Sequence, residues 1–163
     1  MADEELYGVP LKIKRPRIAP KEIIKMAEEV RAAHHENRLD GARIKYLIEP
    51  GAKTGVVSLG KTKRMSHINR LVSKVDFLIV LNWAAWAQLS DATRRALLDH
   101  ELTHCAAQVD GDTGEIKGWE IRKHDVEEFA EIIERHGLWT SGLEEIARPM
   151  SRLVQGELFE KVG

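Results

Sequence analysis

The chain has few of the residues that mark secreted, disulfide-stabilised proteins or membrane proteins. It holds one cysteine in 163 residues, which excludes an internal disulfide and fits a reducing compartment. No apolar run approaches the roughly 18 residues that span a bilayer. No basic segment near the start leads into the apolar stretch of a signal peptide. We therefore expect a cytoplasmic protein with no membrane partner.

Aromatic residues are also scarce, at 6%, but apolar residues make up 43% of the chain, enough for the core of one domain. The formal net charge of -1 hides an uneven distribution. Residues 1–75 hold 16 Lys and Arg against 9 Asp and Glu, whereas residues 76–163 hold 9 against 17. No aromatic and basic nucleic-acid motif accompanies the basic half. Nucleic acid is therefore a weakly supported partner, and the oligomeric state is left open.

The most informative feature of the sequence is the pattern H-E-x-x-H at residues 100–104. On a helix, His100 and His104 project from one face, one turn apart. This is the spacing of zinc peptidases, in which both histidines bind zinc and the glutamate, here Glu101, takes a proton from the activated water. Ser90 is a favourable N-cap for such a helix.

Hydrophobic periodicity and turn residues predict the elements around this motif. Residues 1–20 are expected to form an extended basic arm, residues 21–150 the folded domain and residues 151–163 a loosely held tail. The expected helices cover residues 20–40, 90–107, 124–136 and 143–150, and the expected strands cover residues 42–49, 55–59 and 74–81. Residues 61–74 are expected to form a connection, and residues 108–109 and 115–116 the arms of a hairpin.

Several side chains near these elements allow two interpretations. His34 and His35 are expected to be exposed at a helix end, where they favour the helix dipole, rather than to be ligands. Trp83 and Trp86 could line a substrate groove, but packing of the motif helix against the sheet is the preferred interpretation. Cys105 is expected to be a packed thiol rather than a metal ligand.

Two histidines do not complete a catalytic zinc site, which usually has three protein ligands. His124 is the preferred third ligand, because it opens the predicted helix 124–136. Asp99 or Asp125 could orient one of the ligand imidazoles. The alternative third ligands are Glu127 or Glu128, and last Asp110.

The motif at residues 100–104, followed by residues 124–129, resembles the phage metallopeptidases, a small zincin family similar in pattern to SprT-like proteases. In SprT-like proteins the third histidine opens an H-x-x-x-F motif, and His124 to Phe129 is one residue longer. The resemblance covers residues 44–138. It implies an α+β, minimal zincin-like fold with an N-terminal helix, a small and mostly antiparallel sheet, the HExxH helix and a following ligand-bearing helix.

Motif and resemblance together predict a zinc-dependent metallopeptidase that hydrolyses protein or peptide substrates, in the cytoplasm of the host cell if a phage encodes it. His100, His104 and His124 would bind Zn²⁺, and Glu101 would be the general base. The alternative is a non-enzymatic zinc-binding or DNA-associated interaction protein that retains the fold. The intact glutamate argues against this alternative, because a structural zinc site needs no base.

Overall fold

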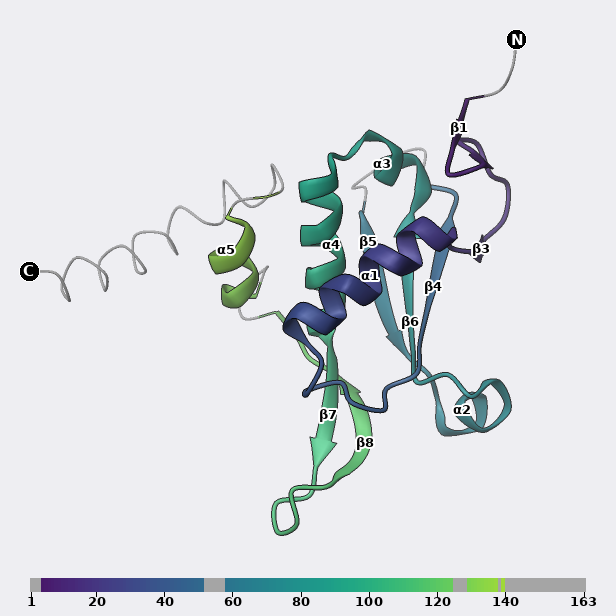
Figure 1. Ribbon diagram of the computed structural model, residues 1–163. Helices are drawn as coiled ribbons and strands as arrows, with labels where there is room; N and C mark the ends of the chain where they lie inside the picture. The colour runs from purple at the N-terminus through teal and green to yellow at the C-terminus, as the bar shows by residue number, and fades with distance from the viewer. Residues whose placement is uncertain (1–3, 52–57, 125–128, 138, 140–163) are drawn as a thin grey trace, which may run out of the picture. The chain divides into compact units, whose positions relative to one another are not determined.

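The computed structural model describes residues 4–51, 58–124, 129–137 and 139. The chain divides into two compact units, residues 1–123 and 124–163. Among the described residues, the first unit contains every strand and four of the five helices, so the protein has an α+β fold (Figure 1). The elements of the first unit are β1 (Glu5–Leu6), β2 (Val9–Pro10), β3 (Arg17–Ile18), α1 (Lys21–His34), β4 (Ile44–Glu49), β5 (Gly60–Arg64), α2 (His67–Ser73), β6 (Phe77–Asn82), α3 (Trp83–Gln88), α4 (Asp91–His104), β7 (Cys105–Val109) and β8 (Ile116–Ile121).

The core of the first unit is a four-stranded sheet with the order β3-β4-β6-β5. Its central pair, β4 and β6, is parallel, and both edge strands are antiparallel to their neighbours. The sheet is therefore mixed: two of its three pairings are antiparallel, in line with the mostly antiparallel sheet that we expected, but the central one is parallel. The parallel pair forms because the chain returns from β4 to β6 through β5 and α2, a connection long enough for a crossover. Tyr46, Ile48, Phe77, Ile79 and Leu81 are buried in this pair, which confirms the two strongest predicted strands.

The segment expected to be a connection contains regular structure. β5 begins at Gly60, and α2 begins at His67, with Ser66 as its N-cap. Of the strand predicted over residues 55–59, Ser58 and Leu59 lie outside any strand and the rest lies outside the described residues. The prediction was wrong here because the lysines of β5 are exposed at the sheet edge, so the strand shows no apolar alternation.

The first helix is shorter than predicted. α1 begins after Pro20, as expected, but ends at His34, and a turn follows through residue 41. Arg31 stabilises this turn by donating to the carbonyls of Leu39 and Ala42, at 2.9 and 2.7 Å. The turn buries His35, whose exposed fraction is 2%. The expectation that His35 is exposed was therefore wrong, although His34 is exposed as predicted.

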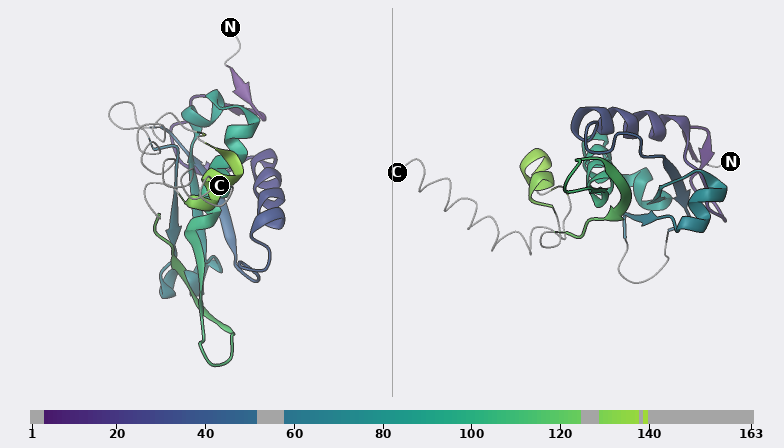
Figure 2. Two further views of the ribbon diagram at one scale, coloured as in Figure 1. Left: turned by 90° about the vertical axis from the view of Figure 1, so that its left-hand side faces the viewer. Right: turned by 90° about the horizontal axis from the view of Figure 1, so that it is seen from below.

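The helix that carries the motif begins as predicted and ends early. The Ser90 side chain accepts from the Thr93 amide at 3.2 Å, and α4 then continues to His104. Cys105 starts β7, which pairs with β8 in a hairpin longer at both arms than expected. The predicted helix, expected to reach residue 107, stops at His104 because the backbone from Cys105 onward pairs with β8 instead of with the preceding turn. Figures 1 and 2 show α1 packed beside α4.

The two tryptophans of α3 belong to the core. Trp83 and Trp86 are fully buried, and the Trp83 Nε1 donates to the carbonyl of Pro10 at 2.8 Å. Arg94 of α4 lies over the Trp86 ring, 5.4 Å from its centroid. These contacts confirm the packing interpretation and attach the short strands β1 and β2 to α3.

The division of the chain at residues 20 and 150 stays a prediction.

The second unit has one described helix, α5 (Ala130–His136). It begins six residues after His124, which is not helical, so the predicted start was wrong. Gly137, with a φ of 66°, ends the helix as expected. Residues 125–128, the predicted helix over residues 143–150 and the tail lie outside the described residues. None of the described helices is long and apolar enough to cross a bilayer.

A buried carboxylate joins the ends of β4 and β6. Asp76 is 1% exposed and accepts from the guanidinium groups of Arg43 and Arg70 at 2.9 to 3.2 Å. Burial tends to raise the pKa of Asp76, but the hydrogen bonds from both arginines outweigh it and hold the pKa below its usual value. This group therefore stabilises the protein above the ordinary carboxyl pKa of 3.8, and the stabilisation is lost as the pH falls through the folded-state value.

Replacing Asp76 with asparagine is expected to reduce the free energy of unfolding at pH 7 by roughly 2 to 3 kcal/mol, because two arginines lose a buried charged partner. Urea denaturation measures this difference, which should shrink as the pH falls below the ordinary carboxyl pKa of 3.8. The exposed pair of Asp91 and Arg94 provides the control, since Asp91→Asn should change stability by at most about 0.5 kcal/mol. Equal effects of the two substitutions would contradict the assignment.

Candidate metal centre

The motif histidines lie on the last turn of α4 and face each other. His100 and His104 have ring centroids 5.0 Å apart and planes inclined by 75°. This arrangement is the one predicted from their four-residue spacing on a helix. One ion can therefore contact both rings.

The β7–β8 hairpin brings the chain back to the end of α4. The Arg122 amide donates to the carbonyl of His104, and the His104 Nδ1 lies 2.7 Å from the carbonyl of Arg122. Because a carbonyl only accepts hydrogen bonds, Nδ1 must carry the hydrogen. The Nε2 of His104 is then the unprotonated nitrogen, which is the form of imidazole that binds a metal.

His124 follows Arg122 by two residues, so the same pair of hydrogen bonds brings this part of the chain close to His104. One ring nitrogen from each of His100, His104 and His124 lies within 4.8 Å of the others. His104 is half-buried and His124 is exposed. These three imidazoles form a group that could hold a metal ion.

The glutamate of the motif is buried and held by the edge strand β5. Glu101 is 3% exposed, and the hydroxyl of Thr62 lies 2.5 Å from its Oε2, where it donates a hydrogen bond. The backbone of Gly60 comes so close that a Cβ there would lie 3.1 Å from Oε1. The Oε2 is therefore oriented by Thr62 of β5, and the absence of a side chain at Gly60 leaves space for Oε1.

The other candidate residues lie elsewhere or are not described. Asp110 is in the hairpin loop, where its Oδ1 accepts from the amides of Asp112 and Thr113, and these bonds lower its pKa. Cys105 is fully buried, as expected of a packed thiol, and burial raises its pKa. The candidates that lie outside the described residues are Asp125, Glu127 and Glu128.

Asp99, expected as a partner of a ligand imidazole, is fully buried and its Oδ1 lies 2.6 Å from His35 Nε2. No local pattern predicts this contact, because His35 and Asp99 are 64 residues apart in the chain. Thr62 and Arg122 were also missed. The only sequence feature of Thr62 is that it is a β-branched residue between two lysines, which does not indicate a contact with Glu101. Arg122 makes its contacts with His104 through its backbone, so its side-chain type carries no signal.

The comparisons with known proteins agree with this geometry. The family model described as "Putative phage metallopeptidase" matches residues 16–154, a longer range than the resemblance of the two motifs alone suggested. No curated protein and no solved structure matches the chain. The match covers well over half of the sequence and includes α4, the hairpin and His124. The chain belongs to the putative phage metallopeptidase family.

Proposed function

We propose that the protein is a zinc-dependent metallopeptidase with His100, His104 and His124 as the zinc ligands. The observation that carries the proposal is the group of three histidine nitrogens within 4.8 Å, together with a buried glutamate between the first two histidines. Membership of a metallopeptidase family supports a protein or peptide substrate.

The donor set fits zinc. Neutral imidazole is a common zinc ligand, and catalytic sites have three protein ligands and one open position. Among residues 4–51, 58–124 and 129–137, no fourth histidine, cysteine or carboxylate joins the group of three. The carbonyl of Arg122 fixes the protonation of His104 in the form that binds metal. A structural zinc site needs no general base, so the buried Glu101 beside these histidines favours a catalytic site.

The chemistry follows from the positions of the side chains. Zinc bound there would lower the pKa of a water molecule toward about 7 and polarise the carbonyl of the scissile peptide bond. Glu101 would accept the proton of the attacking water and then donate it to the leaving amine. Thr62 would keep the Glu101 carboxylate oriented for this transfer through its hydrogen bond to Oε2.

Metal removal tests this function. The wild-type protein with one equivalent of zinc is incubated with a mixture of synthetic peptides, and the products are identified by mass spectrometry. We expect cleavage that disappears after chelation and returns when zinc is added. Cleavage that persists in the chelated protein would contradict the proposal, as would cleavage that magnesium restores as well as zinc.

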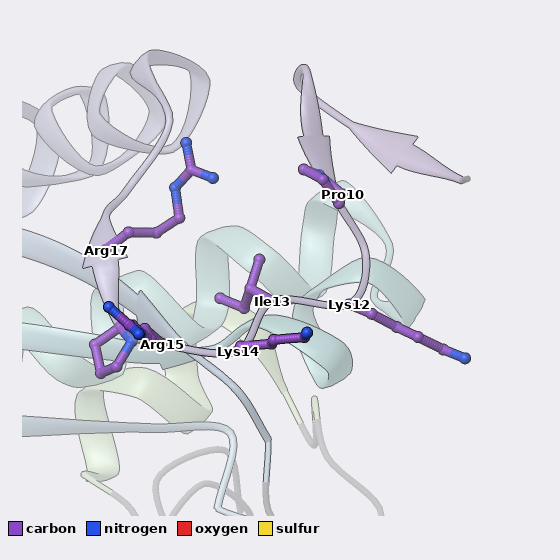
Figure 3. A pocket seen from close by; sticks show the side chains of 7 residues that line it. Pro10, Lys12, Ile13, Lys14, Arg15 and Arg17 are labelled. Carbon is purple, nitrogen blue, oxygen red and sulfur yellow. The ribbon is translucent and has the colours of Figure 1, made fainter. Parts of the chain in front are cut away.

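A second candidate function, association with nucleic acid, is favoured by one feature of the first unit. Four exposed cations, Lys12, Lys14, Arg15 and Arg17, line a hollow of about 450 Å³ between β2 and β3 (Figure 3). None of them forms an ion pair with a residue that the structure describes. Side chains of this kind neutralise backbone phosphates.

If all four cations contact phosphates, binding to a labelled 20-nucleotide strand should weaken with salt, with a log–log slope of about -3. Fluorescence anisotropy measures this slope. Replacing the four cations with glutamine should abolish binding, whereas replacing Lys63 and Lys74, which are exposed elsewhere, should have little effect. No binding at low salt would exclude this second function.

A further inference from the structure

We propose that Arg38, His35 and Asp99 are positioning residues that hold the last turn of α4 in the geometry that His100 and His104 need to bind metal. The expected effect of these residues on zinc affinity rests on the proposed zinc function. Their expected effect on the stability of the last turn of α4 does not depend on it. His35 and Arg38 lie in the turn that follows α1, and Asp99 lies in α4, and Figure 1 shows these two helices side by side.

The end of α4 needs such support. His104 is the last residue of the helix, and the last carbonyls of a helix have no partner within it. Cys105, the C-cap, has φ -73° and ψ 123°, so the helix lacks the left-handed cap that satisfies these carbonyls in many proteins. Helix ends tend to fray, and here the fraying turn would carry both motif histidines.

Arg38 adds charged donors to this end of the helix, where the carbonyl of Leu102 also accepts from the Cys105 amide and that of His104 from the Arg122 amide. Its Nη2 donates to the carbonyl of Leu102 at 3.0 Å, and its Nη1 donates to the carbonyl of Cys105. These two carbonyls lie on either side of His104. The positive charge is also at the favourable end of the helix dipole. Arg38 therefore fixes the backbone that carries the second histidine.

His35 connects Arg38 to the residue before His100. The Arg38 Nη2 lies 2.6 Å from His35 Nδ1, and His35 Nε2 lies 2.6 Å from Asp99 Oδ1. A guanidinium only donates hydrogen bonds, so Nδ1 accepts and Nε2 donates to the carboxylate. The side chains of His35 and Asp99 are 2% and 0% exposed. The network thus holds α4 just before its first motif histidine and again around the second.

Anchors on both sides of a ligand pair matter because a metal site needs its ligands fixed closely. Loss of a residue that orients a ligand typically weakens metal binding by about 10- to 100-fold. We therefore expect Arg38→Met to raise the zinc dissociation constant by about that factor. Arg38→Lys, which keeps a charge and a donor, should restore part of the affinity. Competition with a chromophoric chelator measures both values.

Arg94 provides a matched control. It is also an arginine that donates to two backbone carbonyls, those of Trp86 and Ala87, but it lies near the start of α4, ten residues before His104. Arg94→Met should lower the melting temperature as Arg38→Met does, yet leave the zinc affinity unchanged. Equal loss of affinity in both variants would reduce the role of Arg38 to general stability and overturn the inference.

A second readout needs no metal. Amide hydrogen exchange of the zinc-free protein reports the opening of the last turn of α4. In Arg38→Met, the amides of Thr103, His104 and Cys105 should exchange about tenfold faster or more, while Arg94→Met leaves them unchanged. If only Arg38→Met accelerates exchange of these three amides and the wild-type protein binds no zinc, the positioning role is upheld and the zinc function is refuted. Unchanged exchange in Arg38→Met would overturn the positioning role itself.

Discussion

Replacing Glu101 with glutamine is expected to lower kcat/KM for peptide cleavage by about 10²- to 10⁴-fold, the usual contribution of a general base. Glutamine has nearly the same shape and can still accept the hydrogen bond from Thr62, but it cannot take a proton from water. The fold and the three histidines should be undisturbed, so the bound zinc should not change. Steady-state kinetics on a peptide found to be cleaved measure the loss.

The control for this experiment is Glu115→Gln, a change of the same kind at an exposed position of the hairpin. It should leave kcat/KM unchanged. If Glu101→Gln retained full activity, another residue would be the base. If it lost its zinc, Glu101 would instead be a ligand. Either result would contradict the role proposed for it.

Zinc is expected to raise the melting temperature of the wild-type protein by about 5 to 10 °C, and His124→Ala should lose most of this increase. Zinc at 100 times its dissociation constant stabilises a folded protein by about 2.7 kcal/mol, and each kcal/mol shifts the melting temperature of a protein of this size by about 2 to 4 °C. Loss of the third ligand should raise the zinc dissociation constant, so that the same zinc concentration is close to or below it and stabilises the variant little. Differential scanning calorimetry measures the increase in each variant.

Two substitutions control for the loss of a histidine and for the rival third ligand. His34→Ala removes an exposed histidine of α1 and should keep the full zinc effect. Asp110→Ala removes the hairpin carboxylate and should lower the starting melting temperature, because two amides lose their acceptor, but keep the increase produced by zinc. A zinc effect that disappears in Asp110→Ala and persists in His124→Ala would assign the third ligand to Asp110.

The parts of the fold that depend on local sequence were predictable. Ser90 caps α4 as expected, the apolar run of β6 is buried, and the four-residue spacing of His100 and His104 puts their rings on one face. Each of these features is determined by residues within a few positions of one another. The placement of His100 and His104 side by side on α4 could therefore be predicted from the sequence before their surroundings were known.

The features that were missed depend on distant contacts. His35 follows an amphipathic helix and so was expected to be exposed, but the turn after α1 folds onto α4 and buries it beside Asp99. α4 ends at His104 because the next residues pair with β8 and because Arg38 caps the helix from a separate segment. No local pattern predicts contacts made across more than 60 residues.

The zinc content of purified wild-type, His124→Ala and Glu101→Gln protein, measured by elemental analysis after equilibration with zinc and removal of the excess, tests the central claim most directly. Three histidine ligands and a separate glutamate base predict close to one zinc per chain in wild type and Glu101→Gln, and far less in His124→Ala. Wild-type protein without zinc would contradict the proposed function, and unchanged zinc in His124→Ala would contradict the three-histidine site.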